Sequence, residues 1–397
     1  MPHRAVIRDN AESTKLRVVY DASARAYDGA PSLNECLHTG PSLQNELWNV
    51  IVRNRFHPIA VAGDMRKAFL QIRVKEAERD ALRFHWIKDK STEKLEVLRF
   101  TRVVFGLVPS PLLLNAVIQQ HLESVQSEYP GNVQEIKNSL YVDDLITGDT
   151  TMEGAQQLKH HAVEIFNCAR FTLHKWHSNV PELVGDCTDD EPSFAKQQLG
   201  ASSAREECKL LGLKWDKGDN TLHVSLPSPP ATLTKRGILA NLAKIYDPLG
   251  LVSPAMLEGK QIYRETSEMK LSWDTPLPEG IAKRWLKWDK NAPDDVYFPR
   301  SLVQYQEPVD NIKLHAFGDA SIHGVCAAVY AVVTQFSPFC NPFCNRLQPS
   351  IGVDDSINFI PKSVGCRVSL NIFTETHCAS LNYMCCHTII YEHLKFL

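Results

Sequence analysis

Two adjacent aspartates in one short segment constrain this chain more than any other feature. The segment runs Asn138-Ser-Leu-Tyr-Val-Asp-Asp-Leu-Ile-Thr-Gly148, with Asp143 and Asp144 between two apolar runs. The pattern predicts two short strands joined by a tight turn that presents both carboxylates at its tip. Carboxylate oxygens bind hard divalent cations, and a pair of such cations supports phosphoryl transfer. A solvated Asp-Asp turn is the alternative, because aspartate is favoured in turns for backbone reasons.

A third aspartate stands in a matching setting. Asp64 follows the apolar run Ile59-Ala-Val-Ala-Gly63, as a residue at the end of a buried strand would. The next segment, Phe69-Leu-Gln-Ile-Arg-Val74, mixes apolar and polar residues with the spacing of another strand. We therefore expect Asp64 to meet Asp143 and Asp144 at one edge of a sheet. The alternative for Asp64 is a strand-end residue whose carboxylate is capped by nearby amides.

Several other segments have the periodicity of regular structure. Residues 13–23 are expected to form a strand, and Ala327-Ala-Val-Tyr330 suits another. Trp285 and Trp288, three residues apart, are expected in the core rather than stacked on a base. Helical spacing is expected in the segments Pro41–Ile51, Leu112–Tyr129, Glu153–Ala169 and Leu233–Tyr246.

The order of these motifs resembles that of a known family. The chain resembles reverse transcriptases through five successive stretches: Asp64, Phe105-Gly-Leu-Val-Pro-Ser-Pro111, Tyr141-Val-Asp-Asp144, Phe171-Thr-Leu-His-Lys-Trp176 and Leu210-Leu-Gly-Leu-Lys-Trp215. Three further stretches resemble the BEL/Pao class of long-terminal-repeat retrotransposon polyproteins: Met1–Arg8, Ile245-Tyr-Asp-Pro-Leu-Gly-Leu-Val-Ser-Pro254 and Leu314-His-Ala-Phe-Gly-Asp-Ala-Ser321. The resemblance covers residues 1 to 333.

This resemblance implies an α+β chain with the right-hand polymerase fold of fingers, palm and thumb. The palm would contain an antiparallel sheet, and a truncated ribonuclease H-like segment would follow the thumb. The expected division is fingers and palm at 1–215, thumb and connection at 216–310 with a linker at Pro227–Pro230, the ribonuclease H-like start at 311–333, and an unrelated, poorly ordered tail at 334–397.

The resemblance also implies roles for single residues. Asp64, Asp143 and Asp144 would be catalytic and would hold two Mg²⁺ or Mn²⁺ ions. The residues implied to bind the nucleotide are Lys15, Arg17, Phe69, Phe105, Gly106 and Lys175. Alternatives stay open for three of them: an exposed Arg17 on a strand, a core Phe69 and a solvated Lys175. Asp319 would be the first metal ligand of the ribonuclease H remnant.

Composition limits the partners that the chain can have. No run of about 18 apolar residues is present, so no membrane partner is expected. Residues 1–110 carry 18 Lys and Arg against 13 Asp and Glu, although the whole chain has a net charge of −3. A basic front half suits an RNA or DNA template with its primer. The resemblance to reverse transcriptases implies dNTP as the substrate. The sequence does not determine the oligomeric state.

Cysteine usage and the N-terminus bear on the cellular location. Six of the eleven cysteines crowd into the last 64 residues, in a spacing that does not match a zinc finger. The other five are scattered, as in proteins without a disulfide framework. Because the N-terminus lacks the pattern of a secretory signal, we expect a cytoplasmic retroelement particle or the nucleus rather than secretion.

The sequence leaves two candidate functions. The first is an RNA-directed DNA polymerase fragment that transfers a nucleotide from dNTP to a primer 3′-hydroxyl by two-metal chemistry. The second is a catalytically dead retroelement remnant that at most binds nucleic acid. The three aspartates favour the first function. The start at Met1 within the fingers and the loss of resemblance after Val333 favour the second.

We predict that the chain lacks ribonuclease H activity. One carboxylate, at Asp319, cannot hold two metal ions in the geometry that strand cleavage requires. An RNA–DNA hybrid incubated with the protein and Mg²⁺ should therefore stay intact on a denaturing gel. Hybrid cleavage that disappears in Asp319→Asn would contradict this prediction.

Overall fold

The computed structural model describes most of the chain, and the described residues form helices and five small sheets. The described residues are 1–7, 16–89, 94–184, 207–226, 232–303, 309–320, 325–335, 347–354 and 372–377. Lys15 and the expected linker at Pro227–Pro230 lie outside them.

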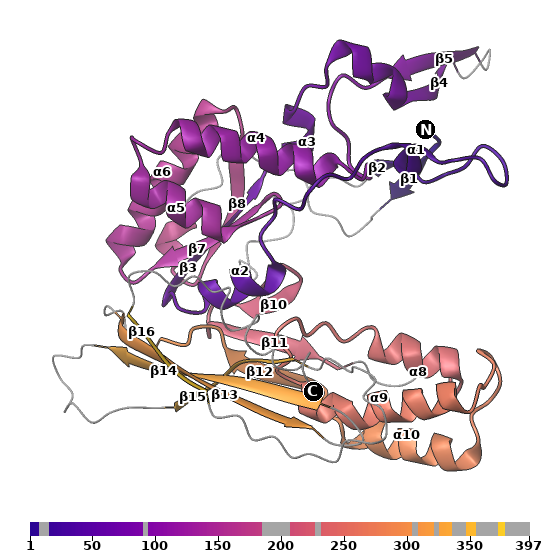
Figure 1. Cartoon of the computed structure of the whole chain (residues 1–397), viewed down its shortest axis with the longest axis vertical. Coiled ribbons are helices and arrows are strands. Elements are labelled where there is room, and N and C mark those ends of the chain that lie inside the picture. The colour runs from indigo at the N-terminus through magenta and orange to yellow at the C-terminus, as the bar shows by residue number, and fades with distance from the viewer. Residues whose placement is uncertain are drawn as a thin grey trace, which may run out of the picture. The chain divides into compact units, whose positions relative to one another are not determined.

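The sheet that carries the aspartates, here called the palm sheet, has four strands. They are β3 (Ile59–Met65), β6 (Leu140–Tyr141), β7 (Asp144–Asp149) and β8 (Leu173–Ser178), in the spatial order β6-β7-β3-β8 (Figure 1). β6 and β7 pair antiparallel. The hairpin thus consists of two strands that are adjacent in sequence. β3, which comes earlier in the chain, lies between β7 and β8.

Three helices pack on the palm sheet and form its core. They are α4 (Ser110–Ser124), α5 (Pro130–Ser139) and α6 (Met152–Cys168) (Figure 1). The core includes Leu114 and Ile118 of α4, Ile136 of α5, and Phe166 of α6, all at most 1% exposed. Each such buried side chain contributes about 1.5–3 kcal/mol relative to exposure. The expected helix over Glu153–Ala169 corresponds to α6.

The expected helix over Leu112–Tyr129 ends earlier than predicted. α4 ends at Ser124, and α5 begins at Pro130. Proline suits the first turn of a helix, because its missing N–H is not needed there. The periodicity was therefore correct, but the end of α4 and the start of α5 were not predicted.

The fingers region consists of two separate strand pairs. β1 (His3–Ile7) pairs antiparallel with β2 (Leu16–Tyr20), and β4 (Arg83–Asp89) pairs antiparallel with β5 (Lys94–Arg99). Aromatic rings connect the two pairs, since the ring of Tyr20 lies 5.1 Å from that of Phe84, centroid to centroid. Small helical segments complete this region: α1 (Leu33–Cys36), α3 (Ala68–Gln71) and η1 (Glu76–Leu82).

A second sheet lies beyond the palm motifs. It has the order β12-β11-β10-β9, built from β9 (Glu207–Leu210), β10 (Leu213–Asp216), β11 (Thr221–Ser225) and β12 (Asp295–Pro299). The division expected after residue 215 falls inside β10. Because β12 pairs antiparallel with β11, residues near 297 complete a sheet that begins near 207.

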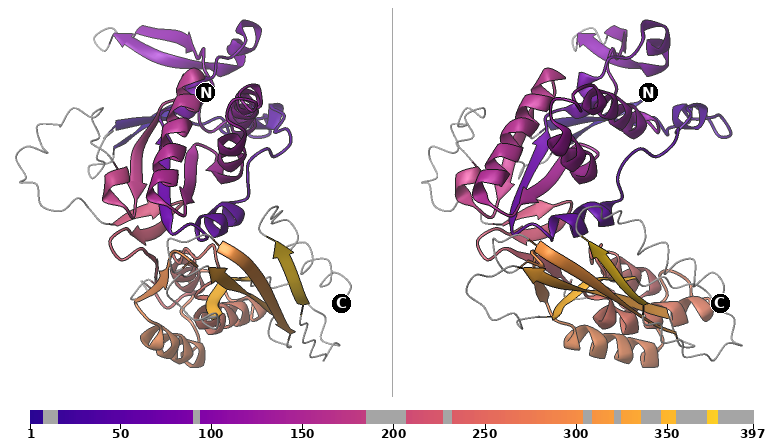
Figure 2. Two further views of the ribbon diagram at one scale, coloured as in Figure 1. Left: turned by 90° about the vertical axis from the view of Figure 1, so that its left-hand side faces the viewer. Right: turned by 60° about the vertical axis from the view of Figure 1, so that its left-hand side comes forward.

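Three helices stand between β11 and β12 in the chain. They are α8 (Lys235–Leu242), α9 (Ser253–Glu268) and α10 (Glu279–Asn291), and α9 contacts both others (Figure 2). Trp285 and Trp288 are 0% and 7% exposed, and their ring centroids lie 4.8 Å apart. They are core residues, as expected. The helix expected over Leu233–Tyr246 is shorter, because α8 ends at Leu242.

The described C-terminal residues form one antiparallel sheet. β13 (Val309–Ala320) and β14 (Val325–Gln335) form an antiparallel hairpin, and Asp319 lies near the end of β13. β15 (Leu347–Asp354) pairs with β14, and β16 (Ile372–His377) pairs with β13. These two strands come from the tail that was expected to be unrelated and poorly ordered, so those strand segments were not predicted. Other residues of the tail lie outside the described ranges.

Two local expectations were wrong. Residues 69–74 are not a strand, because Phe69 lies in the short helix α3. Lys67 has φ 50°, and this left-handed residue turns the chain between β3 and α3. The helix expected from Pro41 begins only at Leu47, where α2 (Leu47–Asn54) starts.

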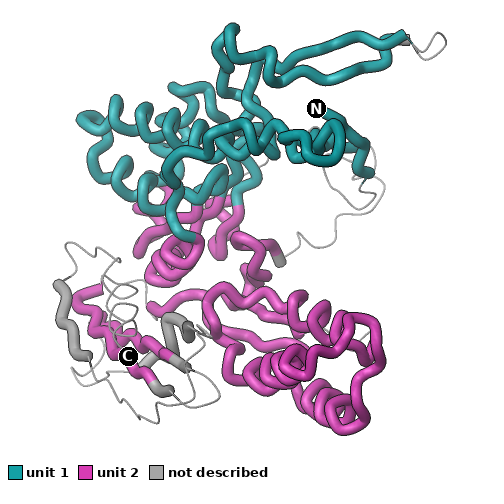
Figure 3. Tube along the Cα trace, turned by 45° about the vertical axis from the view of Figure 1, so that its right-hand side comes forward, with its two compact units in different colours: residues 1–46, 63–145, 157–176 teal, residues 47–62, 146–156, 177–397 magenta. Residues whose placement is uncertain are grey.

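The chain divides into two compact units (Figure 3). The first comprises residues 1–46, 63–145 and 157–176, and the second comprises residues 47–62, 146–156 and 177–397. All three candidate catalytic aspartates belong to the first unit. Among the described helices, none combines the length and the apolar character that a membrane crossing requires.

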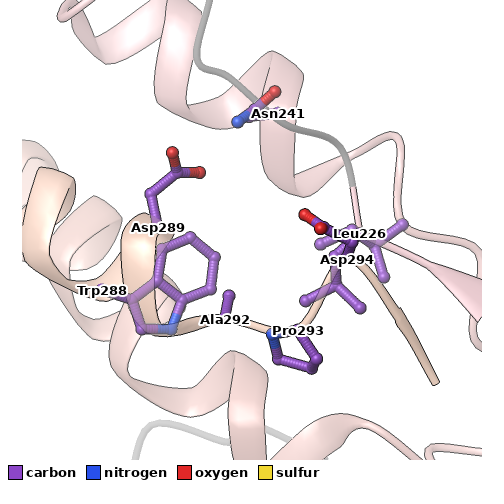
Figure 4. A pocket seen from close by; sticks show the side chains of 8 residues that line it. Leu226, Asn241, Trp288, Asp289, Ala292, Pro293 and Asp294 are labelled. Atoms are coloured by element: carbon purple, nitrogen blue, oxygen red, sulfur yellow. The ribbon is translucent and has the colours of Figure 1, made fainter.

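The second unit contains a small cavity between α8, α10 and the residues that lead into β12 (Figure 4). Asn241 and Asp289 face it from the two helices, and Trp288 and Leu226 contribute apolar walls. Burial raises the pKa of the Asp289 carboxyl. The lining belongs to the packing of the helices and does not assemble a set of catalytic groups.

Gly63 tests how tightly the palm sheet is packed next to Asp64. A Cβ at this position would lie 2.8 Å from Cζ3 of Trp176 on β8, closer than packing allows. We predict that Gly63→Ala lowers the free energy of unfolding by about 1–3 kcal/mol, the usual cost of overpacking. Denaturant unfolding followed by circular dichroism measures this change.

Gly280→Ala is the matched control. Gly280 lies in α10, and a Cβ there would meet no atom within 4 Å. Alanine also has the higher helix propensity, so this variant should be neutral or more stable by up to about 1 kcal/mol. Equal losses in both variants would contradict the close packing of Trp176 on Gly63.

Candidate active site

The three aspartates of the first unit sit on neighbouring parts of the palm sheet. Asp64 is the next-to-last residue of β3, Asp143 lies in the turn after β6, and Asp144 begins β7. The backbone N–H of Met65 donates a hydrogen bond of 2.8 Å to the carbonyl oxygen of Asp143. This bond fixes the turn beside the end of β3, so residues that are distant in sequence become neighbours.

The turn that carries Asp143 is strained. Tyr141 pairs with Asp144, which leaves Val142 and Asp143 as a two-residue loop. Val142 has φ 54°, in the left-handed region that a β-branched residue rarely adopts. Two-residue loops with a positive φ at the first position usually have glycine there. A conformation of this kind costs of the order of 1–3 kcal/mol and is held by its surroundings.

Ionisation of the two hairpin aspartates, Asp143 and Asp144, is unfavourable where they lie. Burial raises the pKa of Asp144 to about 7, with the negative charges of Asp143 and Asp64 adding to the effect and Lys175 opposing it. The pKa of Asp143 is raised too, first by burial and then by the charge of Asp64. The three groups are thus close enough to repel one another, and a positive charge among them would relieve that repulsion.

Two side chains of β8, an imidazole and an ammonium group, approach Asp64. The Nε2 atom of His174 lies 3.2 Å from Oδ2 of Asp64, and the Nζ atom of Lys175 lies 3.5 Å from the same oxygen. Lys175 has φ 52°, so the strand is locally distorted where it approaches the site. The sequence pattern did not point to His174, although it stands next to Lys175 in the motif that was recognised.

The donor set suits a hard divalent cation, but the side chains are not arranged around one. Asp64, Asp143 and Asp144 offer carboxylate oxygens, the ligands that Mg²⁺ and Mn²⁺ prefer. Across the residues that the structure describes, no group of three or more His, Cys, Asp or Glu is placed to hold a metal ion. The Asp64 carboxylate is engaged by His174 and Lys175 instead.

The expected nucleotide-binding residues are partly brought together. Phe69 is only 4% exposed and belongs to the palm core, whereas Phe105 is 58% exposed with its ring centroid 4.5 Å from that of Phe69. Gly106 has φ 88°, a conformation that glycine adopts without cost. Arg17 is exposed on β2 opposite Val6. Whether these residues bind a nucleotide stays a prediction.

Asn34 is a further residue that the sequence pattern did not reveal. Its Nδ2 atom donates to the carbonyl oxygen of Gly106 at 2.9 Å, and its Oδ1 atom accepts from the N–H of Val108 at 3.1 Å. Asn34 therefore fixes the turn that presents Phe105 and Gly106. Asn34 lies in α1, and a single asparagine there gives no sequence signal that it binds a turn far along the chain.

Asp319 lies near the end of β13, in register with Cys326 of β14. The structure describes only the backbone at this position. Glu375, an acid of the tail, is in strand β16 and in register with Lys313. The hairpin is thus present, and its role as a metal site stays a prediction.

Comparison with known proteins identifies two segments. Residues 32–213 match the family of reverse transcriptases (RNA-dependent DNA polymerases), and residues 234–340 match the Pao retrotransposon-like RNaseH-like domain. The fold is similar to that of a foamy viral protease-reverse transcriptase solved in complex with an RNA/DNA hybrid, with a TM-score of 0.51 and 13% identity. The match covers 90% of this chain and 39% of that chain. No curated protein matches the sequence.

Each family match covers less than half of the chain, and the structural similarity concerns the fold. The chain carries a reverse-transcriptase region followed by an RNase H-like region of the Pao retrotransposon type, as the motifs predicted. The α+β architecture is that of a reverse transcriptase. Reverse transcriptases generally use divalent metal ions. The second match begins at residue 234, inside the segment expected to be thumb and connection, so the expected domain boundaries stay a prediction.

The raised pKa of Asp144 predicts how metal-free protein responds to pH. Its pKa is about 3.8 unfolded and about 7 folded, so between these values the folded state holds a proton that the unfolded state has lost. This contribution to stability is fully present below about pH 4 and is lost as the pH rises through about 7. We expect stability in EDTA to fall between about pH 4 and pH 7, as measured by denaturant unfolding.

Asp144→Asn provides the comparison, because the amide does not titrate. Its stability should change less over the same pH interval, and at the alkaline end of that interval it should exceed that of the wild type. Parallel pH curves for the two proteins would show that Asp144 ionises normally.

Proposed function

We propose that this chain is an RNA-directed DNA polymerase fragment that adds dNTP to a primer 3′-hydroxyl. The observation that carries the proposal is the position of Asp64 beside the Asp143–Asp144 hairpin, within the residues that match reverse transcriptases. The chain covers 39% of the length of the similar viral protein. The proposal therefore rests on the residues of this chain and not on the activity of that protein.

The three aspartates would hold the metal ions. When bound, two Mg²⁺ or Mn²⁺ ions would neutralise charge on the reacting phosphate and lower the pKa of the attacking hydroxyl. The carboxylates of Asp144 and Asp143 repel each other where they are partly buried. A bound divalent cation would neutralise this repulsion, which would increase the affinity of the two carboxylates for the cation. Asp64 would exchange its contacts with His174 and Lys175 for a shared ligand position.

Other residues of the first unit would position the nucleotide. Lys175 is more than one-third exposed and close to Asp64, where its ammonium group could stabilise the leaving pyrophosphate or donate a proton to it. Phe105 and Gly106 form an exposed turn that suits a base or sugar. Phe69 beneath Phe105 would exclude a 2′-hydroxyl sterically, which is the proposed basis of selectivity for dNTP.

The proposed partners follow from the same region. The similar viral enzyme is bound to an RNA/DNA hybrid, and we propose that this chain takes an RNA or DNA template with its primer. Exposed cations of the first unit, among them Arg17 and Arg66, are suited to phosphate contacts. We propose that the protein acts in a cytoplasmic retroelement particle or in the nucleus.

A catalytically inactive remnant is the second candidate. The observation that favours it is the engagement of Asp64 by His174 and Lys175, with no three-ligand metal group among the described residues. Such a protein would still offer a basic surface to nucleic acid. The two candidates differ in turnover and not in binding, so a kinetic assay separates them.

Primer extension on an RNA template with Mg²⁺ or Mn²⁺ tests the proposal. We expect wild-type protein to extend the primer with dNTP, and Asp143→Asn to reduce the rate by more than about a hundredfold, because a charged metal ligand is lost. Binding of the template–primer, measured by fluorescence anisotropy, should change little in this variant.

Glu123→Gln is the control. It also removes one negative charge, but from the exposed surface of α4, and its rate should equal that of the wild type. Template–primer binding without any extension by the wild type, with either metal, would support the inactive remnant instead.

A further inference from the structure

We propose that Arg300 is a positioning residue for the strands that carry the catalytic aspartates. Arg300 follows β12 and lies in the second unit, at residues that match the RNase H-like family rather than the reverse-transcriptase family. The inference rests on the proposed polymerase function and assigns a role in it to a residue far from the aspartates in sequence.

The guanidinium of Arg300 is completely buried and all of its donors are used. Nη1 donates to the carbonyl oxygen of Asn54 at 2.8 Å and to its Oδ1 at 3.2 Å. Nη2 donates to the carbonyl oxygens of His57 and Pro58 at 2.8 and 2.9 Å. Nε donates to Oδ1 of Asn220 at 2.6 Å. These five bonds match the five N–H donors that a guanidinium presents in one plane.

The acceptors are the loop that leads into β3. Asn54 is the last residue of α2, residues 55–58 connect α2 to β3, and β3 begins at Ile59 and carries Asp64. By binding carbonyl oxygens on both sides of residue 56, Arg300 fixes the path of this loop at the start of the strand. A lysine, with three donors on a single nitrogen, cannot reproduce this arrangement.

Asn54 extends the same network to the second acid-bearing strand. Its Nδ2 atom donates to the carbonyl oxygen of Thr147 at 3.0 Å, and Thr147 lies in β7, three residues after Asp144. Asn54 and Thr147 are each 1% exposed. Arg300 therefore binds the β3 loop directly and reaches β7 through one buried side chain.

The segment around Arg300 is held in return by Arg55. Its Nε donates to the carbonyl oxygen of Arg300 at 3.1 Å, and its own carbonyl oxygen accepts from the N–H of Leu302 at 2.7 Å. Burial lowers the pKa of Arg55 to about 10 and that of Arg300 to about 9, so each side chain stays charged at neutral pH. Two buried cations side by side are costly, and dense hydrogen bonding offsets that cost.

Trp215 completes the site on the side of the second sheet. The guanidinium carbon of Arg300 lies 5.7 Å from the centre of the fully buried Trp215 ring, and Nε1 of Trp215 donates to Oδ1 of Asn220 at 3.2 Å. The motif that ends at Trp215 thus serves as the platform for Arg300. Arg300 and Arg55 together link the C-terminal matched segment to the residues that precede β3 in the N-terminal one.

Hydrogen exchange of the full chain tests the proposal without requiring activity. In Arg300→Lys, amides of residues 59–65 and 144–149 should exchange at least about tenfold faster, while amides in α10 keep their wild-type rate, since opening is local. Arg300→Met is the stronger variant, and Arg55→Met should reproduce the pattern if Arg300→Met fails to fold. Arg284→Met, which removes an exposed arginine of α10, should leave all of these rates unchanged.

Single-turnover primer extension gives the second measurement. Arg300→Lys should lower the extension rate at saturating dNTP by about tenfold to a hundredfold, with little change in the dNTP concentration at half-maximal rate, because misplaced acids affect chemistry more than binding. A purely structural role predicts instead a lower Tm, uniformly faster exchange and a normal rate per folded molecule.

These results distinguish failure of the inference from failure of the proposed function. If wild-type protein does not extend primers, the polymerase proposal fails and the exchange pattern alone decides the role of Arg300. Wild-type exchange at residues 59–65 and 144–149 in folded Arg300→Lys and Arg55→Met would overturn the inference, whatever the activity.

Discussion

Mutual repulsion among Asp64, Asp143 and Asp144 is the constraint on which the rest of the structure depends. Burial and neighbouring negative charge raise the pKa of Asp144 to about 7, so the site is unfavourable unless protons or cations are present. Left to themselves, such groups would move apart into solvent. The palm sheet prevents this by binding the turn to the end of β3 through the Met65–Asp143 hydrogen bond. Backbone hydrogen bonds therefore keep the three carboxylates close together, although the carboxylates repel one another.

The same argument explains the strained residues near the aspartates. Val142 and Lys175 both have left-handed backbones, with φ 54° and 52°, although neither is glycine. Such conformations persist only where the surrounding packing determines them. Core side chains supply that packing, among them Leu145 at 0% exposure directly after Asp144. Strain and repulsion thus occur together where the neighbouring structure is well packed.

The sequence predicted the parts of this structure that depend on local pattern. The hairpin around Asp143, the strand before Asp64 and the helix over residues 153–169 each follow from the periodicity of a short segment. Prediction failed where the backbone leaves the expected path, as at Lys67, whose left-handed turn replaces a strand with α3. His174 and Asn34 were missed because each contacts a residue far away in the sequence. A contact of that kind leaves no periodic signal.

The contacts of Arg300 could not be predicted from the sequence either, and they also indicate which residues support the aspartates. Three of the five acceptors of Arg300 are backbone carbonyl oxygens, and a bond to a backbone carbonyl places no demand on the side chain of the partner residue. The acceptors of Arg300 could therefore not be inferred from the sequence around residues 54–58. Because β12 also completes the sheet that begins at β9, residues near 300 are structurally part of the region that supports the palm strands. The boundary between the two family matches, at residues 213 and 234, is thus a boundary of sequence similarity and not of the physical unit that holds the aspartates in place.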